Sequence, residues 1–167
     1  CMAETGRLDI LVNNAGGSPP VEAATASPVI TDKIIQLNLV APLVLSQMAY
    51  SAMSATKESA NIINIASVSG ARPSPGTAAY GAAKAGLLSA TKSLAQEWGP
   101  GVRVNAIIVG LVHHDAGIEH YGGPEGFAKV AQMLPLKRMA EPTDIADACM
   151  YLSSQQAAYV SGASLEV

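Results

Sequence analysis

The chain has 167 residues, of which 49% are hydrophobic, 14% charged and 4% aromatic, and 10 Lys and Arg against 13 Asp and Glu give a formal charge of -3. This composition predicts a single globular domain over residues 1–167 and excludes a disordered tail. The mild acidity, with no cluster of Lys or Arg, argues against binding to nucleic acid or to an anionic membrane, so small molecules are the expected partners. The 2 cysteines have no CxxC spacing, which indicates a reducing, cytoplasmic location.

Neither a membrane-spanning segment nor a secretory signal is expected from the sequence. The most apolar stretch is interrupted by Asn38, Pro42, Ser46 and Gln47, which leaves less than the roughly 18 residues that cross a bilayer. The N-terminus has no basic segment followed by an apolar one, which is the pattern of a secretory signal.

Four short apolar runs predict buried β-strands. They do not alternate between apolar and polar residues, which is typical of strands covered on both faces in a parallel sheet. The runs cover residues 8–14, 61–67, 102–109 and 163–167. The segments between them are long enough for helical crossovers, so the sequence predicts an α/β fold with right-handed connections.

Three crossover helices are predicted between these strands. Ser27 can cap the first helix. The second covers about residues 75–98 and ends at a Gly-Pro-Gly sequence. The third begins near Pro142, and its apolar residues, Cys149 among them, fall on one stripe that predicts a buried face.

Residues 112–134 have no sustained apolar period and directly follow a predicted strand. Because α/β folds place ligand-covering loops at this position, we interpret the segment as a lid. His113, His114, Asp115 and His120 could gather as metal ligands there, but such residues also contact substrates from flexible lids. We therefore expect no catalytic metal and interpret His114 as a substrate contact.

A tyrosine and a lysine four positions apart form the most informative motif, Tyr80-Gly-Ala-Ala-Lys84. In the predicted helix the two side chains share one face, about one turn apart. A free tyrosine titrates near ~10, so it exchanges protons poorly at neutral pH unless a nearby positive charge favours its phenolate. Lys84 can supply that charge, which makes Tyr80 a candidate general acid/base. The alternative is an ordinary surface pair of tyrosine and lysine.

Ser67 and Asn38 add to this candidate site. Ser67 ends a predicted strand, and the following loop leads into the Tyr80 helix, so Ser67 could hold a substrate carbonyl beside the phenol. No GxSxG motif surrounds Ser67, which argues against a serine hydrolase. Pro42 cannot donate to the Asn38 carbonyl four residues earlier, which predicts a kink and a carbonyl that could hold a water near Lys84. A simple proline bend is the alternative.

The first predicted strand ends in Asn13-Asn14-Ala15-Gly16-Gly17. Small residues here let a flat ligand approach the backbone, and the asparagine side chains can tie adjacent strand ends together. With these features, the sequence resembles the classical short-chain dehydrogenases/reductases over essentially the whole chain. The motifs that carry the resemblance are, in chain order, Asn13-Asn14-Ala15-Gly16, Asn38, Ser67, Tyr80-Gly81-Ala82-Ala83-Lys84 and Val102-Arg103-Val104-Asn105.

The resemblance implies a Rossmann-like, doubly wound parallel sheet, with this chain as the C-terminal part of a three-layer α/β/α sandwich. It also implies reversible hydride transfer between NAD or NADP and an alcohol/carbonyl pair, with Tyr80 as general acid/base. The implied catalytic residues are Asn38, Ser67, Tyr80 and Lys84. The implied cofactor-binding residues are Asn13, Ala15, Gly16, Tyr80, Lys84, Gly110, Val112 and His114.

The resemblance further implies a homodimer or homotetramer, because relatives pair their subunits through helices that correspond to the Tyr80 helix. That helix carries Ala78, Ala82, Gly86 and Ala90, small residues that permit close helix contact. The alternative is that these residues pack on the sheet of their own chain.

The sequence departs from the family pattern at three points. It contains no GxGxxG motif, which the family carries on an initial strand-turn-helix, so we expect a βαβαβ segment to precede Cys1 in the natural protein. Val109-Gly110 stands where most relatives have Pro-Gly, and His114 stands where the family has threonine.

Two alternatives to a dehydrogenase stay open at this point. One is an epimerase or dehydratase that uses the same tyrosine and lysine on a nucleotide-sugar. The other is a regulator that binds NAD(P) without catalysis, because a fold does not by itself determine an activity. The spacing of Asn38 and Ser67 and the compact lid favour the dehydrogenase.

Overall fold

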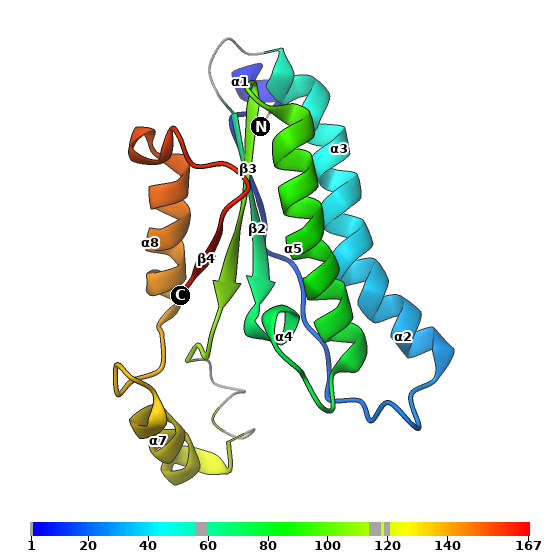
Figure 1. Cartoon of the computed structure of the whole chain (residues 1–167), viewed down its shortest axis with the longest axis vertical. Coiled ribbons are helices and arrows are strands. Elements are labelled where there is room, and N and C mark those ends of the chain that lie inside the picture. The colour runs from blue at the N-terminus through cyan, green and yellow to red at the C-terminus, as the bar shows by residue number, and fades with distance from the viewer. Residues whose placement is uncertain (1, 56–59, 114–117, 119–120) are drawn as a thin grey trace.

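The computed structural model describes residues 2–55, 60–113, 118 and 121–167, and its centre is a parallel sheet of four strands (Figure 1). The strands are β1 (Ile10–Asn13), β2 (Ala60–Ser67), β3 (Val102–Val109) and β4 (Ser164–Glu166), side by side in chain order. In the register of the sheet, Asn13 lies opposite Asn64, and Ser67 lies opposite Val109. The carboxyl ends of the strands therefore meet at one edge of the sheet.

Helices cover both faces of the sheet, which gives three layers. One face carries α2 (Pro28–Ile35), η1 (Gln36–Val40), α3 (Ala41–Ser54) and α5 (Ala78–Trp98), and the other carries α8 (Pro142–Ser153) (Figure 1). The remaining helices are α1 (Met2–Thr5), α4 (Val68–Ala71), α7 (Gly123–Met133) and η2 (Gln155–Ala157). This arrangement confirms the predicted α/β class and the doubly wound parallel sheet.

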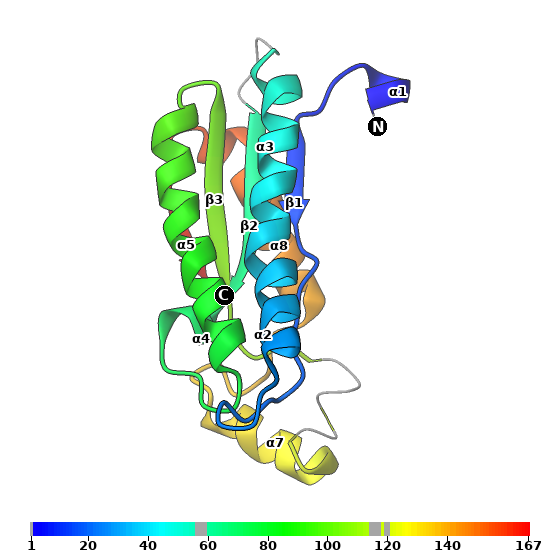
Figure 2. The ribbon, with the colours of Figure 1, turned by 90° about the vertical axis from the view of Figure 1, so that its right-hand side faces the viewer.

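The connection through α8 differs in hand from the two before it. From β1 to β3 the chain crosses on the face of α3 and α5, but from β3 to β4 it crosses on the opposite face, while the strand order continues in the same direction (Figure 2). The first two connections are right-handed, so the last is left-handed. The expectation of right-handed connections throughout is therefore wrong for α8, whose Ala148 and Leu152 pack against Ile63 and Ile107 on the face that α5 leaves open.

Local sequence signals explain where the helices begin and end. The Ser27 side chain accepts a hydrogen bond from the Ile30 N–H and caps α2, as predicted. α5 ends at the predicted Gly-Pro-Gly sequence but begins at Ala78, because Gly76 just before it adopts a φ of 77°, which a right-handed helix does not contain. α8 begins at the predicted Pro142, and Cys149 packs against the core as expected.

The helical stretch Pro28–Ser54 is long and apolar enough to cross a membrane by length and composition alone. The expectation that polar residues leave too short an apolar run is therefore wrong, since these residues are spread along one helical stretch that includes a π-helical turn. Two of them are buried: Asn38 hydrogen-bonds to Gly17 in the loop after β1, and Ser46 accepts a hydrogen bond from Asn13 of β1. Ala49 and Met53 pack against the core strands. These contacts are those of a helix packed on a sheet.

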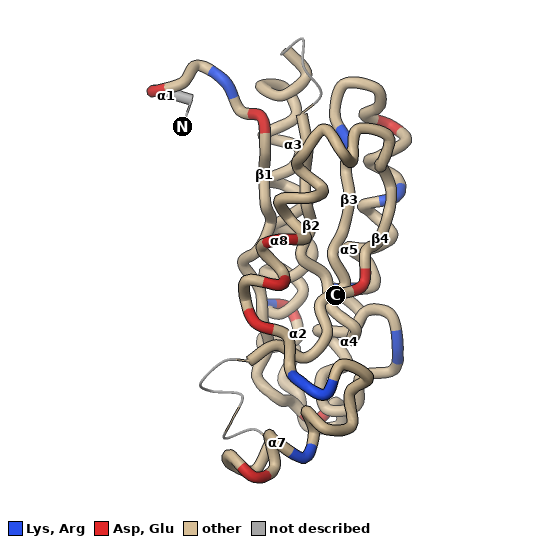
Figure 3. The backbone as a smooth tube through the Cα atoms, turned by 90° about the vertical axis from the view of Figure 1, so that its left-hand side faces the viewer, with Lys and Arg blue, Asp and Glu red and all other residues tan. Residues whose placement is uncertain are grey.

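Charged residues are scattered along the chain, and Figure 3 shows no large patch of one sign on the part of the backbone that is coloured. β1 forms one edge of the sheet, and its Ile10 and Val12 are exposed, so the prediction of a buried strand is wrong for β1.

Candidate active site

The loop after β1 begins the site, and a buried asparagine fixes its path. The Asn38 amide accepts a hydrogen bond from the Gly17 N–H (2.9 Å) and donates to the Gly17 carbonyl (2.8 Å) and to the Ile34 carbonyl (2.9 Å). A Cβ on Gly16 would lie 2.7 Å from Asn38 Oδ1 and 3.1 Å from Lys84 Nζ. Only glycine permits this close approach of the loop to both side chains.

The helix is interrupted at Asn38, as the sequence predicts. Residues Gln36–Val40 form a π-helical turn in which the Ala41 N–H donates to the Gln36 carbonyl. Pro42 has no N–H with which to bond the Asn38 carbonyl, which favours this wider turn. The role of the Asn38 carbonyl in holding a water remains a prediction.

Asn13, which was predicted to bind the cofactor, lies in the protein interior. Its Nδ2 donates to Asn64 Oδ1 (2.8 Å) and to Ser46 Oγ (3.0 Å), and Asn64 Nδ2 donates to Thr91 Oγ1 (2.9 Å). The network ties β1 and β2 to α3 and α5, which confirms that an asparagine joins adjacent strand ends. Asn13 does not line the cavity described next, so the geometry does not support a cofactor contact by its side chain.

A cavity of about 690 Å³ lies at the carboxyl ends of β2 and β3. Three predicted catalytic residues line it, namely Ser67, Tyr80 and Lys84. The predicted cofactor-binding residues that line it as well are Gly16, Gly110 and Val112. Ser67 comes from the end of β2, where its Oγ accepts a hydrogen bond from the Ser69 N–H (3.2 Å), and Tyr80 and Lys84 come from the first two turns of α5.

Lys84 is the only charged side chain among the described residues that line this cavity. It is 3% exposed, its Nζ donates to the Ile65 carbonyl (2.7 Å), and Nζ lies 5.7 Å from the centroid of the Tyr80 ring. Burial lowers the pKa of Lys84 from 10.5 to about 8, so the side chain is still mainly an ammonium at neutral pH. A positive charge at this place stabilises negative charge on the neighbouring phenol.

The predicted lid, residues 112–134, includes the helix α7. The expectation that the segment has no sustained period is wrong here, because Phe127, Val130 and Ala131 follow helical spacing. Gly122, with a φ of 83°, precedes the helix and Pro124 lies in its first turn, which are ordinary signals of a helix start. Figure 1 places α7 beyond the carboxyl ends of the strands, where the lid was expected.

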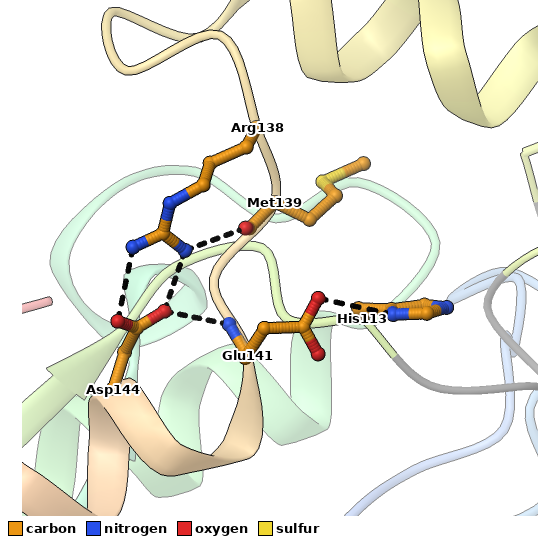
Figure 4. Close-up of polar contacts among 5 residues, drawn as sticks. All are labelled: His113, Arg138, Met139, Glu141 and Asp144. Carbon is orange, nitrogen blue, oxygen red and sulfur yellow. Dashed lines mark hydrogen bonds and ion pairs between the residues drawn. The ribbon is translucent and has the colours of Figure 1, made fainter.

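The base of the lid is tied to the start of α8 (Figure 4). His113 Nδ1 lies 3.2 Å from Glu141 Oε1, and the His113 ring packs against Phe127 with centroids 5.2 Å apart. Arg138 forms an ion pair with Asp144 (2.6 Å), and its hydrogen bond lowers the pKa of Asp144 to about 2. His113 therefore joins α7 to α8 and does not line the cavity.

Asn38 and Ala15 do not line this cavity, and His114, Asp115 and His120 lie outside the described residues. Within the described ranges, no group of three His, Cys, Asp or Glu side chains could hold a metal ion. Tyr121 does line the cavity, although the sequence pattern did not single it out; its position in a lid segment after β3 is the signal that could have identified it.

The chain is similar to known proteins along nearly its whole length. A family model described as Enoyl-(Acyl carrier protein) reductase matches residues 1–167. An uncharacterized short-chain type dehydrogenase/reductase from Sinorhizobium fredii is 39% identical over 169 residues, and the 3-oxoacyl-(acyl-carrier-protein) reductase FabG from Rickettsia prowazekii is 36% identical over 167 residues. These alignments cover 96% and 99% of this chain, but the chain spans only 29% and 68% of the two relatives.

The fold is also that of solved structures. The structure of 4-hydroxyisoleucine dehydrogenase complexed with NADH matches with a TM-score of 0.84 and 34% sequence identity, over 99% of this chain and 69% of that one. Sequence and fold thus agree along the whole chain, and both show that it belongs to the short-chain dehydrogenase/reductase family.

Proposed function

We propose that the protein is an NAD(P)-dependent oxidoreductase that interconverts an alcohol and a ketone or aldehyde. The observation that carries the proposal is the buried ammonium of Lys84, 5.7 Å from the centroid of the Tyr80 ring in a cavity that Ser67 also lines. Burying a charge is unfavourable, and ionisable groups perturbed by burial in a cleft are typical of active sites. The position of Lys84 is therefore better explained by chemistry than by stability.

Each of these side chains has a role in the proposed reaction. The Ser67 hydroxyl orients the substrate oxygen by a hydrogen bond. The Tyr80 phenol donates a proton to that oxygen during reduction and accepts it during oxidation. The Lys84 ammonium stabilises the phenolate that remains after the proton has left, and the Asn38 carbonyl would hold a water that links the site to solvent.

The cavity has features that fit the nicotinamide end of the cofactor. Gly16 has no Cβ, so its backbone lies close to Lys84 at the cavity wall, and Gly110 and Val112 line the same cavity. In the described part of the chain Lys84 Nζ donates to one carbonyl, whereas an ammonium has three N–H groups, so it can also bind ribose hydroxyls. When bound, the nicotinamide supplies or accepts the hydride. The NADH complex of the 4-hydroxyisoleucine dehydrogenase supports this assignment.

We also propose that the protein forms a homodimer or a homotetramer. α3 contains no charged residue, and Val44, Leu45 and Met48 on it are 43%, 49% and 70% exposed. Gly86 of α5 is used within the chain instead, because a Cβ there would lie 3.0 Å from the Leu39 side chain. The exposed apolar side of α3 is therefore the surface that favours association.

The replacement Tyr80→Phe tests the proposed reaction. It keeps the aromatic ring and removes the hydroxyl group that exchanges the proton, so kcat should fall by about 10²–10⁴-fold while cofactor affinity changes little. Turnover is followed by the absorbance of reduced nicotinamide with a panel of alcohols and ketones. Tyr50→Phe is the matched control, because Tyr50 stacks on Trp98 and does not line the cavity.

Other results would contradict the proposal. Undiminished turnover by Tyr80→Phe would remove Tyr80 as the acid/base. Cofactor binding without turnover of any alcohol or ketone would favour a regulator, and conversion of a nucleotide-sugar without a net absorbance change would favour an epimerase.

A further inference from the structure

Tyr80 also lines a second, smaller cavity beside the one just described. This side cavity has a volume of about 220 Å³ and lies among the loop after β1, α2 and the start of α5. Its walls are mostly apolar and include Val21, Ala26, Ile34 and Ala78. Ser18, Thr31 and Thr77 also line it, and none of the described lining residues is charged. A lining of this kind favours an apolar ligand and disfavours a charged one, which would lose its hydration without gaining a partner.

The walls of the side cavity are fixed by hydrogen bonds within the chain. Both backbone groups of Gly17 bond to Asn38, at the beginning of the loop. In the middle of the loop the Val21 N–H donates to the Gly76 carbonyl (2.7 Å), which joins the loop to the segment before α5. At its end Ser27 caps α2. The side cavity is thus formed before a ligand arrives, which lowers the entropic cost of binding.

We propose that the side cavity binds the apolar substituent of the substrate, so that the preferred substrate carries one compact alkyl or aryl group beside the reacting carbon. This inference rests on the proposed oxidoreductase function. Because Tyr80 lines both cavities, a substrate oxygen held at its phenol brings the adjoining substituent next to the side cavity. An apolar cavity of about 150 Å³ holds benzene, so about 220 Å³ holds a phenyl or branched alkyl group but not a long acyl chain.

The first test is a series of methyl ketones whose second substituent grows from methyl through butyl and phenyl to decyl. The wild-type protein should show a kcat/KM that rises about three- to fourfold for each added methylene, until the side cavity is full, and that falls again for decyl. A kcat/KM that does not depend on the substituent would overturn the inference.

Three matched replacements test whether the dependence of kcat/KM on the substituent arises at the side cavity. Ala26→Leu and Ala23→Leu add bulk at the wall of the side cavity, whereas Ala24→Leu adds the same bulk to the same loop outside it. The first two should lower kcat/KM for the phenyl ketone by about 10- to 100-fold, with less than about a twofold change for acetone. Ala24→Leu should keep the wild-type profile. Equal losses for every ketone in the first two variants would overturn the inference.

A binding measurement separates this inference from the proposed function. Toluene is titrated into protein labelled with ¹³C at isoleucine methyl groups, and the Ile34 signal is followed by NMR. A saturable shift is expected for the wild type and for Ala24→Leu, and its loss for Ala26→Leu. A saturable shift without turnover of any ketone would overturn the proposed function alone, whereas turnover with a flat substituent profile and no shift would overturn only the inference about the side cavity.

Discussion

Replacing Lys84 by methionine should change how the stability of the protein depends on pH. Burial lowers the pKa of Lys84 to about 8, against 10.5 for the exposed side chain of the unfolded chain. Below pH 8 the lysine is protonated in both states, so its contribution to the free energy of unfolding is constant. Between pH 8 and 10.5 the unfolded chain holds the proton and the folded chain loses it. Stability of the wild type must therefore rise with pH relative to the methionine variant.

The size of this rise follows from the two pKa values. Each unit of difference between the two pKa values corresponds to about 1.4 kcal/mol. The difference between about 8 and 10.5 therefore raises the free energy of unfolding by about 3 kcal/mol once the pH has passed both values. The assay is urea unfolding at several pH values between 7 and 10.5, followed by the fluorescence of Trp98, the single tryptophan, which stacks on Tyr50. The quantity to plot is the free energy of unfolding of the wild type minus that of Lys84→Met, because other titrating groups cancel in this difference.

An exposed lysine on the same helix provides the control. Lys92 lies two turns further along α5 and is exposed, so Lys92→Met removes a lysine from the same helix without removing a buried charge. A difference for Lys84→Met that is no steeper with pH than the difference for Lys92→Met would mean that the Lys84 ammonium is not desolvated in the folded protein. The electrostatic argument that connects Lys84 with Tyr80 would then lose its basis.

Two further predictions concern the interior and the surface. Asn13→Ala removes the donor to Asn64 Oδ1 and should lower the free energy of unfolding by about 1–3 kcal/mol, without changing the KM for cofactor; a raised KM at unchanged stability would instead restore Asn13 as a cofactor ligand. Met48→Glu places a charge on the apolar side of α3 and should convert the oligomer to a monomer in light scattering, whereas Met150→Glu on α8, at the same 70% exposure, should not. A monomeric wild-type protein would contradict the proposed assembly.

The strands and most helices of this fold could be predicted because their signals are local. The strand over residues 102–109 matches β3, since a continuous run rich in β-branched residues specifies a strand covered on both faces. The crossing of α8 on the opposite face could not be predicted, because either hand is compatible with the same apolar stripe. The choice depends on which face of the sheet is still free, and that is decided by α3 and α5, far away in the sequence.

The site residues also divide into those with a local sequence signal and those whose position depends on distant segments. Ser67, Tyr80 and Lys84 could be predicted, because a strand end followed by a helix start brings their side chains to one edge of the sheet. The burial of Asn13 away from the cavity could not be predicted, since the direction of a side chain at a strand end depends on the pleat and on the register opposite Asn64, so a cofactor contact by Asn13 stays a prediction. The side cavity beside Tyr80 had no sequence signal, because its walls come from three separate segments.

The polar groups buried in this fold are of two kinds, and the difference between them supports the proposed chemistry. Asn13 donates to Asn64, Asn64 donates to Thr91, and Thr91 donates to the Leu87 carbonyl. These bonds offset most of the cost of burial and join layers of the fold, although Asn13 Oδ1 has no hydrogen-bond partner among the described residues. Desolvation lowers the pKa of Lys84, which means that the free energy of burying its charge is not fully offset by favourable contacts in the folded protein. Natural proteins keep such destabilising groups where function requires them. A lysine that weakens the fold around neutral pH, beside a phenol and a hydroxyl in one cavity, is therefore best explained by a positive charge that the reaction needs.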